Sequence, residues 1–456
     1  MLGEDRALAS LRDVLRLVPA DEAEATVLIE DKALTRFANS AIHQNVAESN
    51  ARLLVRAVVK GGVGTAITNR LDEDSLRRVA GQAAALARLQ PPDPGWPGLP
   101  GAQPRQEGPS YVEATAATSA ADRARAVRIV VDAASRLRLS ATGAFSTEVA
   151  ELAIANTAGL EAYAPATLAS LRTVVDANPP QGLGFLTGYA DAISRDVTRI
   201  DAQAVAARAV SKCVLNRDPL PLPPGAYVTV LEEIAVADLL RFLAMLGLSA
   251  QAVQEGRSFA VGQMDRQVCS QNLTLWDDAT DGRGLALPFD WEGVPAGRLA
   301  LIENGVLRGL TYDTRSAARE DKRSTGHAAS QFPDLSSQWP QATHLFIAPG
   351  DTARDELMAG VERGVLVTRF HYTHCPDPQR LLVTGTTRDG TFLIKDGRIA
   401  GALRNLRFTQ GVLEAFSNIE AISSRPELHR DWWSSAAHHV PAMSLGRFQF
   451  TAGTRF

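Results

Sequence analysis

The feature that most constrains the fold is a proline-rich break near the middle of the chain. The segment DPLPLPPG at residues 218–225 places four prolines among eight residues. Proline has a fixed φ and no backbone N–H, so neither a helix nor a central strand can run through this stretch. The 456-residue chain is also too long for one ordinary domain. We therefore predict that a separate C-terminal domain begins at residue 224.

A second break lies in the first half, where residues 91–109 read PPDPGWPGLPGAQPRQEGP. Such a density of proline and glycine predicts a loop or linker. The two breaks together predict three parts: an N-terminal α/β subdomain at residues 1–92, a middle α/β subdomain at 110–216, and a β-rich C-terminal domain at 224–456.

The N-terminal half alternates strand and helix patterns. Several β-rich pieces between residues 24 and 64 predict an antiparallel meander, and a second strand series follows residue 140 with a turn at residues 156–159. Helical periodicity appears at about 73–89, 119–137 and 199–215. With the strand-dominated second half, this pattern predicts an α+β fold.

The C-terminal domain opens with a strand that leads into an apolar helix. Residues 225–231, GAYVTVL, favour an extended backbone, and apolar residues then recur at helical spacing from Ile234 to Leu248. Farther on, Asp396-Gly397 predicts the turn of a hairpin, because Asp-Gly favours positive φ.

Composition limits the environment and the partners. A formal charge of −4 gives no overall electrostatic reason to expect nucleic acid or an anionic membrane as partner. No window approaches the roughly 18 apolar residues of a membrane span, and the acidic start MLGEDRALAS does not resemble a secretory signal. We therefore expect a cytoplasmic protein. Three widely spaced cysteines suggest no disulfide framework.

Few residues point to catalysis when they are read without any resemblance. The chain has no GxSxG elbow, no phosphate-binding loop and no HExxH. His371, His374 and Cys375 lie within five residues and include ligand types that zinc uses, but on a regular strand positions 371 and 374 face opposite sides. His327 is the other candidate ligand. For all four, the alternative is an ordinary hydrogen-bonded or loop residue.

Five segments, in this order, carry a resemblance that spans nearly the whole chain: LTRFANSAIHQN, PPGAYVTVLEEIAVADLL, DWEGVPAGRLALIENGVLRGLTYDTRSA, STGHA, and VTRFHY with TGTTRDGTFLIKDGRIAGALRNLRFTQGVLEAF. The chain resembles the TldD/PmbA family, also called "modulator of DNA gyrase" proteins. That resemblance implies a strand-rich C-terminal domain of the TldD/PmbA type and a peptide-processing complex of two related subunits.

In the catalytic TldD branch of the family, the resemblance implies an HExxxH motif on the helix after the central strand and a cysteine on a later strand. Here the two histidine positions hold Arg241 and Leu246, the glutamate position holds Phe242, and the later cysteine position falls near Thr386. None of these side chains offers a neutral imidazole, a thiolate or a general base. We therefore expect no catalytic residue and no metal in this subunit.

These expectations predict a non-catalytic, TldE/PmbA-like subunit of a heteromeric metallopeptidase. Its expected partners are a zinc-containing, HExxxH-bearing TldD-like subunit and unfolded peptide, with a homodimer when the chain is alone. Two alternatives stay open: an autonomous metallopeptidase that uses His327, His371, His374 or Cys375, and a regulatory protein-binding module.

Overall fold

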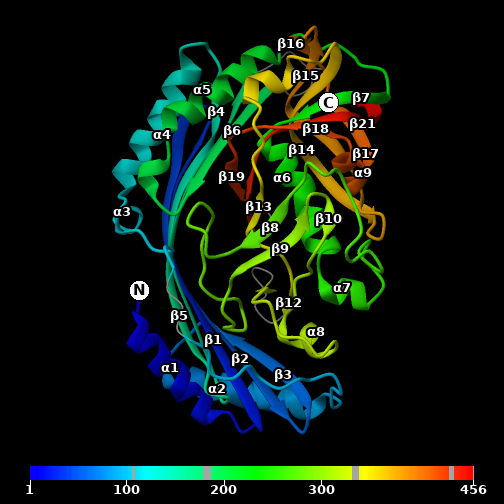
Figure 1. Ribbon diagram of the computed structural model, residues 1–456. Coiled ribbons are helices and arrows are strands. Elements are labelled where there is room, and N and C mark those ends of the chain that lie inside the picture. The colour runs from blue at the N-terminus through cyan, green and yellow to red at the C-terminus, as the bar shows by residue number, and fades with distance from the viewer. Residues whose placement is uncertain (105–107, 178–185, 331–337, 431–435, 455–456) are drawn as a thin grey trace.

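The first half of the chain builds one long antiparallel sheet with the strand order β3-β2-β1-β4-β5-β6 (Figure 1). The computed structural model describes residues 1–104, 108–177, 186–330, 338–430 and 436–454. In chain order, the elements of this half are α1 (Glu4–Leu17), β1 (Glu22–Ala38), β2 (Ala41–Val59), β3 (Gly62–Thr68), α2 (Glu73–Leu89), α3 (Glu113–Ala116), α4 (Ala120–Ser135), β4 (Ser140–Asn156), β5 (Glu161–Asp176), β6 (Thr187–Ser194), a 3₁₀ turn (Val197–Arg199) and α5 (Ala202–Leu215).

The strands of this sheet are longer than the pieces that the sequence pattern suggests. β1 runs unbroken for 17 residues, because its polar middle stays paired: Asp31 lies opposite both Ser49 of β2 and Val149 of β4. This pairing also joins residues on either side of the 91–109 linker in one sheet. The division into α/β subdomains 1–92 and 110–216 stays a prediction.

Helices α1, α2, α4 and α5 cover much of the outer face of the sheet, and the C-terminal domain lies against the inner face (Figure 1). α1 and α2 pack on one end of the sheet in a single apolar cluster, and α4 and α5 pack on the other end in a second cluster. The starts of α2, α4 and α5 have the side-chain caps expected of Asp and Ser. Asp72 accepts a hydrogen bond from the Ser75 N–H at 3.1 Å, and Ser119 with Asp122 forms a capping box.

The C-terminal domain is organised around a sheet that closes on itself, because two strands of its path, β14 and β15, also pair with each other. β14 pairs with β7 in parallel and with β15 in antiparallel fashion, so the path β14-β7-β21-β17-β15 returns to its start. The phenylalanines 370, 408 and 448 stack inside the adjoining core. The predicted hairpin is confirmed, with φ of 50° at Asp396 and 77° at Gly397.

A second sheet of this domain has the order β10-β9-β8-β13-β20-β19. The elements of the domain, in chain order, are β7 (Gly225–Leu231), α6 (Glu233–Phe242), a π turn (Leu243–Gly247), α7 (Ala250–Gln254), β8 (Leu275–Asp278), β9 (Arg298–Glu303), β10 (Val306–Leu307), α8 (Thr314–Ala318), β11 (Ala328–Ser330), β12 (Gln338–Pro340), β13 (Leu345–Ile347), a 3₁₀ turn (Arg354–Met358), β14 (Arg363–Asp377), β15 (Leu382–Lys395), β16 (Arg398–Ala402), β17 (Leu406–Gly411), α9 (Val412–Ser417), β18 (Ile419–Ile422), β19 (Glu427–Arg430), β20 (Ala437–Val440) and β21 (Met443–Gly453).

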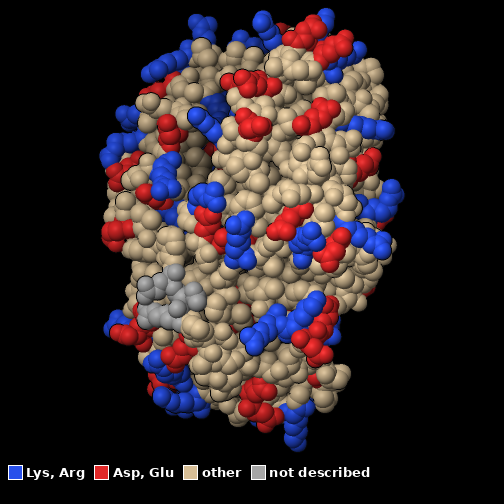
Figure 2. All heavy atoms as spheres, viewed as in Figure 1, with Lys and Arg blue, Asp and Glu red and all other residues tan. Residues whose placement is uncertain are grey.

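One face of the molecule shows no dominant charge. On the face shown in Figure 2, basic and acidic side chains are interspersed over both domains.

None of the described helices is both long enough and apolar enough to span a lipid bilayer.

Candidate functional site

The candidate site lies where α6 meets β14 and β15, at the junction of the two domains. α6 follows β7 as predicted, but the regular helix ends at Phe242 and continues as a π turn through Gly247. The wider turn reduces the angle between positions five apart, and π turns recur at functional sites. The three helix positions that the resemblance assigns to the metal motif therefore lie at this change of helix geometry.

The side chains at those three positions are engaged in packing and hydrogen bonding. The Arg241 guanidinium donates to Thr373 Oγ1 of β14 at 2.9 Å and lies 4.6 Å from the Phe242 ring centroid. Phe242 is buried, and Leu246 packs against the same core cluster. A cationic guanidinium and two hydrocarbon side chains do not fit a divalent metal ion.

Thr386, the position expected for the later cysteine, lies on β15 directly opposite His371 of β14. Its hydroxyl donates to the His371 carbonyl oxygen at 3.3 Å. The neighbouring residue on β15 is Gly385, and it leaves room for the Thr373 side chain. Any larger residue at position 385 would place its Cβ 2.8 Å from Thr373 Cγ2. The fold thus brings the strand of Thr386 beside the residue that Arg241 contacts, although none of these groups is a zinc ligand of the family type.

The cluster from His371 to Cys375 is spread along an irregular edge of β14. The strand register shifts on both sides of His374, which is exposed. Burial, together with Arg388 and Arg369, lowers the pKa of His371 to about 4, and burial raises the pKa of the Cys375 thiol. Among the described residues, no group of three or more His, Cys, Asp or Glu side chains is placed to hold a metal ion.

His327 is remote from that cluster and lies in a cavity of about 150 Å³ between the two domains. Its Nε2 lies 3.2 Å from Asp277 Oδ1, and its Nδ1 lies 2.7 Å from the Thr325 carbonyl oxygen. Burial alone would lower the pKa of His327, but Asp277 raises it, and the net shift is upward. Both ring nitrogens therefore have polar neighbours, so His327 lies here as a paired core histidine.

A partly buried arginine, Arg195, lines the same cavity. Arg195 donates to the Thr167 carbonyl oxygen of β5 at 2.9 Å and to the carbonyl oxygens of Leu285 and Ala286 at 3.0 and 2.8 Å. Burial lowers its pKa to about 10. Arg195 therefore connects the backbone of the first sheet to that of the C-terminal domain.

Two carboxylic acids lie buried beside the cavity. Burial raises the pKa of Asp290 to about 7 and, with the neighbouring Asp290 and Asp313, raises that of Glu292 to about 8. The Asp290 carboxyl accepts the N–H groups of Glu292, Val294 and Ala328, each at 2.9 Å. Near neutral pH this pair is therefore partly protonated.

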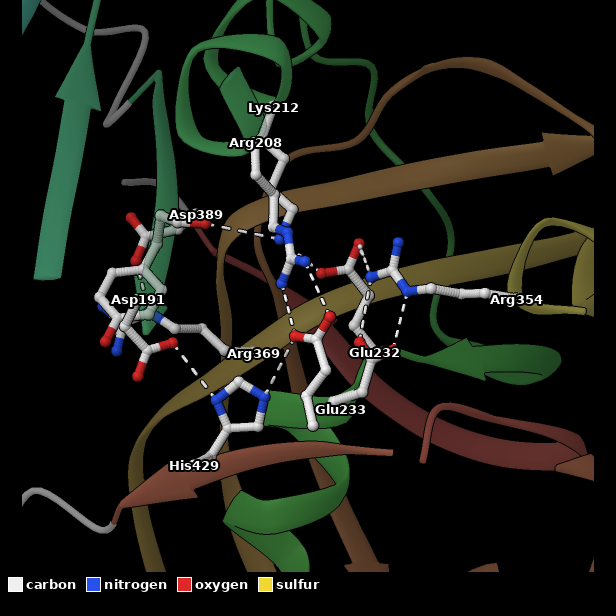
Figure 3. A network of polar contacts seen from close by, with 11 residues as sticks. Asp191, Arg208, Lys212, Glu232, Glu233, Arg354, Arg369, Asp389 and His429 are labelled. Carbon is white, nitrogen blue, oxygen red and sulfur yellow. Dashed lines mark hydrogen bonds and ion pairs between the residues drawn. The ribbon is translucent and has the colours of Figure 1, made fainter. Parts of the chain in front are cut away.

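A network of ion pairs joins the domains at the start of α6 (Figure 3). Lys212 of α5 contacts Glu232, and Arg208 of α5 binds Glu427 of β19 with two hydrogen bonds of 2.6 and 2.8 Å. Arg354 binds Glu233 through its Nε at 2.8 Å. All these groups lie between α5 of the first half and β7, α6 and β19 of the second.

The network continues to the buried His429 of β19, whose Nε2 lies 3.8 Å from Glu427. His429 Nδ1 lies 3.3 Å from Asp191 of β6, and Asp389 binds both Arg369 at 2.5 Å and the Thr187 hydroxyl at 2.6 Å. Sequence reasoning did not single out these residues. Lys212, a lysine on an Ala-rich helix, and the acidic pair after β7 are the signals that could have pointed to them.

Two family models match the sequence. The model described as PmbA/TldA metallopeptidase C-terminal domain matches residues 224–452, and the model described as PmbA/TldA metallopeptidase domain 1 matches residues 30–87. The fold and these matches together indicate a metalloprotease-like protein. The chain belongs to the PmbA/TldD family, which confirms the resemblance.

Curated relatives agree with this assignment. A metalloprotease from Methanothermobacter thermautotrophicus is 25% identical over 244 residues, or 53% of each chain. A metalloprotease TldD homolog from Buchnera aphidicola is 27% identical over 250 residues, covering 53% of this chain and 50% of the relative. The chain thus matches about half the length of these relatives.

Solved structures match over nearly the whole chain. TldE from Thermococcus kodakarensis has a TM-score of 0.88 at 20% identity, covering 98% of this chain and 100% of the other. A protein from Thermotoga maritima whose name links it to modulation of a DNA gyrase has a TM-score of 0.82 at 19% identity, covering 98% of this chain and 99% of the other. These likenesses confirm the α+β fold with a strand-rich C-terminal domain.

Proposed function

We propose that this chain is a non-catalytic, TldE-like subunit of a heteromeric metallopeptidase complex that processes unfolded peptides. Its role is to provide part of the scaffold and to bind peptide, while an HExxxH-bearing subunit holds the zinc and performs the hydrolysis. We place the complex in the cytoplasm.

One observation carries the proposal. At the helix positions of the family's metal motif, Arg241 is hydrogen-bonded to Thr373, Phe242 is buried and Leu246 packs on the core. Without a ligand or a general base there, the family's zinc chemistry has no support in this chain. The cavity near His327 supports the binding role, since it combines apolar walls with a few polar groups.

The test combines this chain with an HExxxH-bearing relative from the same genome. We expect the purified chain to contain no stoichiometric zinc and to leave unfolded peptide intact, and the mixture to cleave it. A partner in which glutamine replaces the motif's glutamate is the matched control and should give an inactive mixture. The measurements are metal content by mass spectrometry and peptide cleavage by chromatography.

Zinc-dependent cleavage by this chain alone would overturn the proposal. The variant His371→Ala with His374→Ala then identifies the source of that activity. Loss of both metal and cleavage in the variant would establish the autonomous metallopeptidase instead.

A further inference from the structure

The interdomain cavity that contains His327 also has a positive charge on its wall without an anionic partner. Arg195 lines this cavity, and its two Nη atoms donate only to the carbonyl oxygens of Thr167, Leu285 and Ala286. Among the described residues, no carboxylate forms an ion pair with the guanidinium, and its Nε is buried without a hydrogen-bond partner. Carbonyl oxygens solvate a cation but do not neutralise it, so the charge of Arg195 favours an anion in the cavity.

Three acidic residues also line the cavity, but each has partners of its own. Asp277 Oδ1 lies 3.2 Å from His327 Nε2. The Asp290 carboxyl accepts three backbone N–H groups at 2.9 Å, and Glu148 lies 3.9 Å from Lys32 Nζ. The acids are therefore engaged with groups other than Arg195, and a ligand can supply the anion that Arg195 lacks.

Other parts of the wall are apolar and enclose a small space. Leu168 of β5 and, from the C-terminal domain, Leu285 and Phe289 line the cavity and are buried. A cavity of about 150 Å³ can hold a benzene-sized group. This cavity is also partly open to the outside. It therefore has room for one apolar side chain with a carboxylate beside it, while the rest of a chain extends outward.

We propose that the cavity binds the carboxyl-terminal residue of a peptide, with the carboxylate against Arg195 and an apolar side chain between Leu168 and Phe289. The last residue of a peptide carries a backbone carboxylate next to its side chain, which internal residues do not. Junctions between domains are frequent sites of such ligands. The inference rests on the proposed function in taking peptide as the source of the carboxylate.

The experiment is titration calorimetry of the full chain, without metal or a second subunit, using small leucine derivatives. N-acetyl-leucine has both the carboxylate and the branched side chain, so we expect it to bind. N-acetyl-leucinamide has the same shape without the negative charge, and we expect its affinity to be lower by about tenfold or more. Equal affinities for the acid and the amide, or no binding of the acid, would contradict the proposal.

Two further ligands distinguish a peptide from a simple carboxylic acid. The tripeptide alanyl-alanyl-leucine extends N-acetyl-leucine outward, and 4-methylpentanoate is leucine without its amino group. We expect the tripeptide to bind at least as tightly as 4-methylpentanoate, because the cavity is partly open. A tripeptide that binds about tenfold more weakly than 4-methylpentanoate would instead indicate a site for free carboxylic acids.

Substitutions test the location. Ala166 lies on β5 and lines the cavity, so Ala166→Leu should fill it and abolish binding of N-acetyl-leucine. Ala85→Leu is the matched control, because Ala85 is exposed on α2, and its binding should equal that of the wild type. Arg195→Met should lower the affinity for N-acetyl-leucine about tenfold and leave that for N-acetyl-leucinamide unchanged. Thermal unfolding shows whether each variant is folded, and undiminished binding by folded Ala166→Leu would place the site elsewhere.

These measurements fail separately from the test of the proposed function. A mixture with the HExxxH-bearing subunit that cleaves peptide, combined with no binding of N-acetyl-leucine here, would refute the cavity assignment alone. An inactive mixture combined with the expected binding series would refute the proposed complex and leave the carboxylate site in place.

Discussion

At the scale of single residues, burial decides what each polar group can do. His327 and His429 are nearly inaccessible, yet each lies beside a carboxylate that raises its pKa against the effect of burial. Arg241 is half-buried and has a hydroxyl partner on β14. These three residues therefore act as structural contacts, whereas His371 is kept neutral by its surroundings.

The buried acid Glu292 should make stability depend on pH. Its pKa is raised to about 8, so the folded chain holds a proton there that the unfolded chain releases near its ordinary pKa. The resulting stabilisation is full below that ordinary pKa and is lost as pH rises through about 8. The free energy of unfolding of the wild type should therefore fall between pH 5 and pH 9. In Glu292→Gln, whose side chain stays neutral, this fall should be smaller by roughly 2–4 kcal/mol.

Urea unfolding at several pH values measures this effect. The exposed Glu303→Gln is the control, and its pH profile should follow that of the wild type. The raised pKa values of His327 and His429 contribute to every profile, so the difference between the variants reports on Glu292 together with its neighbour Asp290. Parallel profiles for Glu292→Gln and the wild type would contradict the prediction.

At the scale of elements, the sequence predicted which segments are helices and strands better than how they meet. Helix α2 begins and ends at the predicted residues, because Asp72 and the apolar period mark it clearly. The length of β1 and β2 was missed, since their polar residues are paired across the sheet and carry no apolar signal. The π turn after Phe242 has no sequence signature of its own.

The candidate site was predictable only in part. The positions Arg241, Phe242, Leu246 and Thr386 came from resemblance, and the fold brings the helix and both strands together. Some ion pairs in Figure 3 join residues that are far apart in the sequence, such as Arg208 with Glu427 and Asp191 with His429. Local spacing cannot predict such partners, because they are chosen by the docking of two domains.

The contact of α5 with β6 gives a prediction at this scale. A Cβ at Gly188 of β6 would lie 2.2 Å from the Ala209 carbonyl oxygen and 2.4 Å from the Cys213 nitrogen, both in the backbone of α5. Gly188→Ala must therefore displace the helix and should destabilise the chain by about 2–3 kcal/mol. Gly401→Ala on β16, which meets no atom within 4 Å, should change stability by less than about 0.5 kcal/mol.

Thermal unfolding compares these two variants, and hydrogen exchange of the α5 amides locates the effect. Faster exchange confined to α5 in Gly188→Ala is the expected result. Equal stability of Gly188→Ala and Gly401→Ala would show that α5 can move away from β6 without loss.

At the scale of the whole molecule, the two halves are held together by buried charges as well as by apolar packing. Lys212 and Glu232 are both nearly inaccessible, and the Glu232 carboxyl also lies 3.4 Å from Arg354. Burial alone would raise the pKa of Glu232, but Lys212 and Arg354 lower it, and the net shift is downward. The carboxylate therefore depends on cations from both halves of the chain.

Removing Lys212 should lower the free energy of unfolding by more than the Lys212–Glu232 ion pair itself contributes. The reason is that the buried Glu232 carboxylate then lacks its nearest cation. Lys212→Met should therefore destabilise the chain by about 3 kcal/mol. Adding Glu232→Gln removes the stranded charge, so the double variant should recover a large part of that loss. Arg12→Met, which breaks an exposed pair with Glu161, is the control and should have a much smaller effect. Urea unfolding of the four chains gives the comparison, and a double variant no more stable than Lys212→Met would show that Lys212 holds the domains together through contacts other than Glu232.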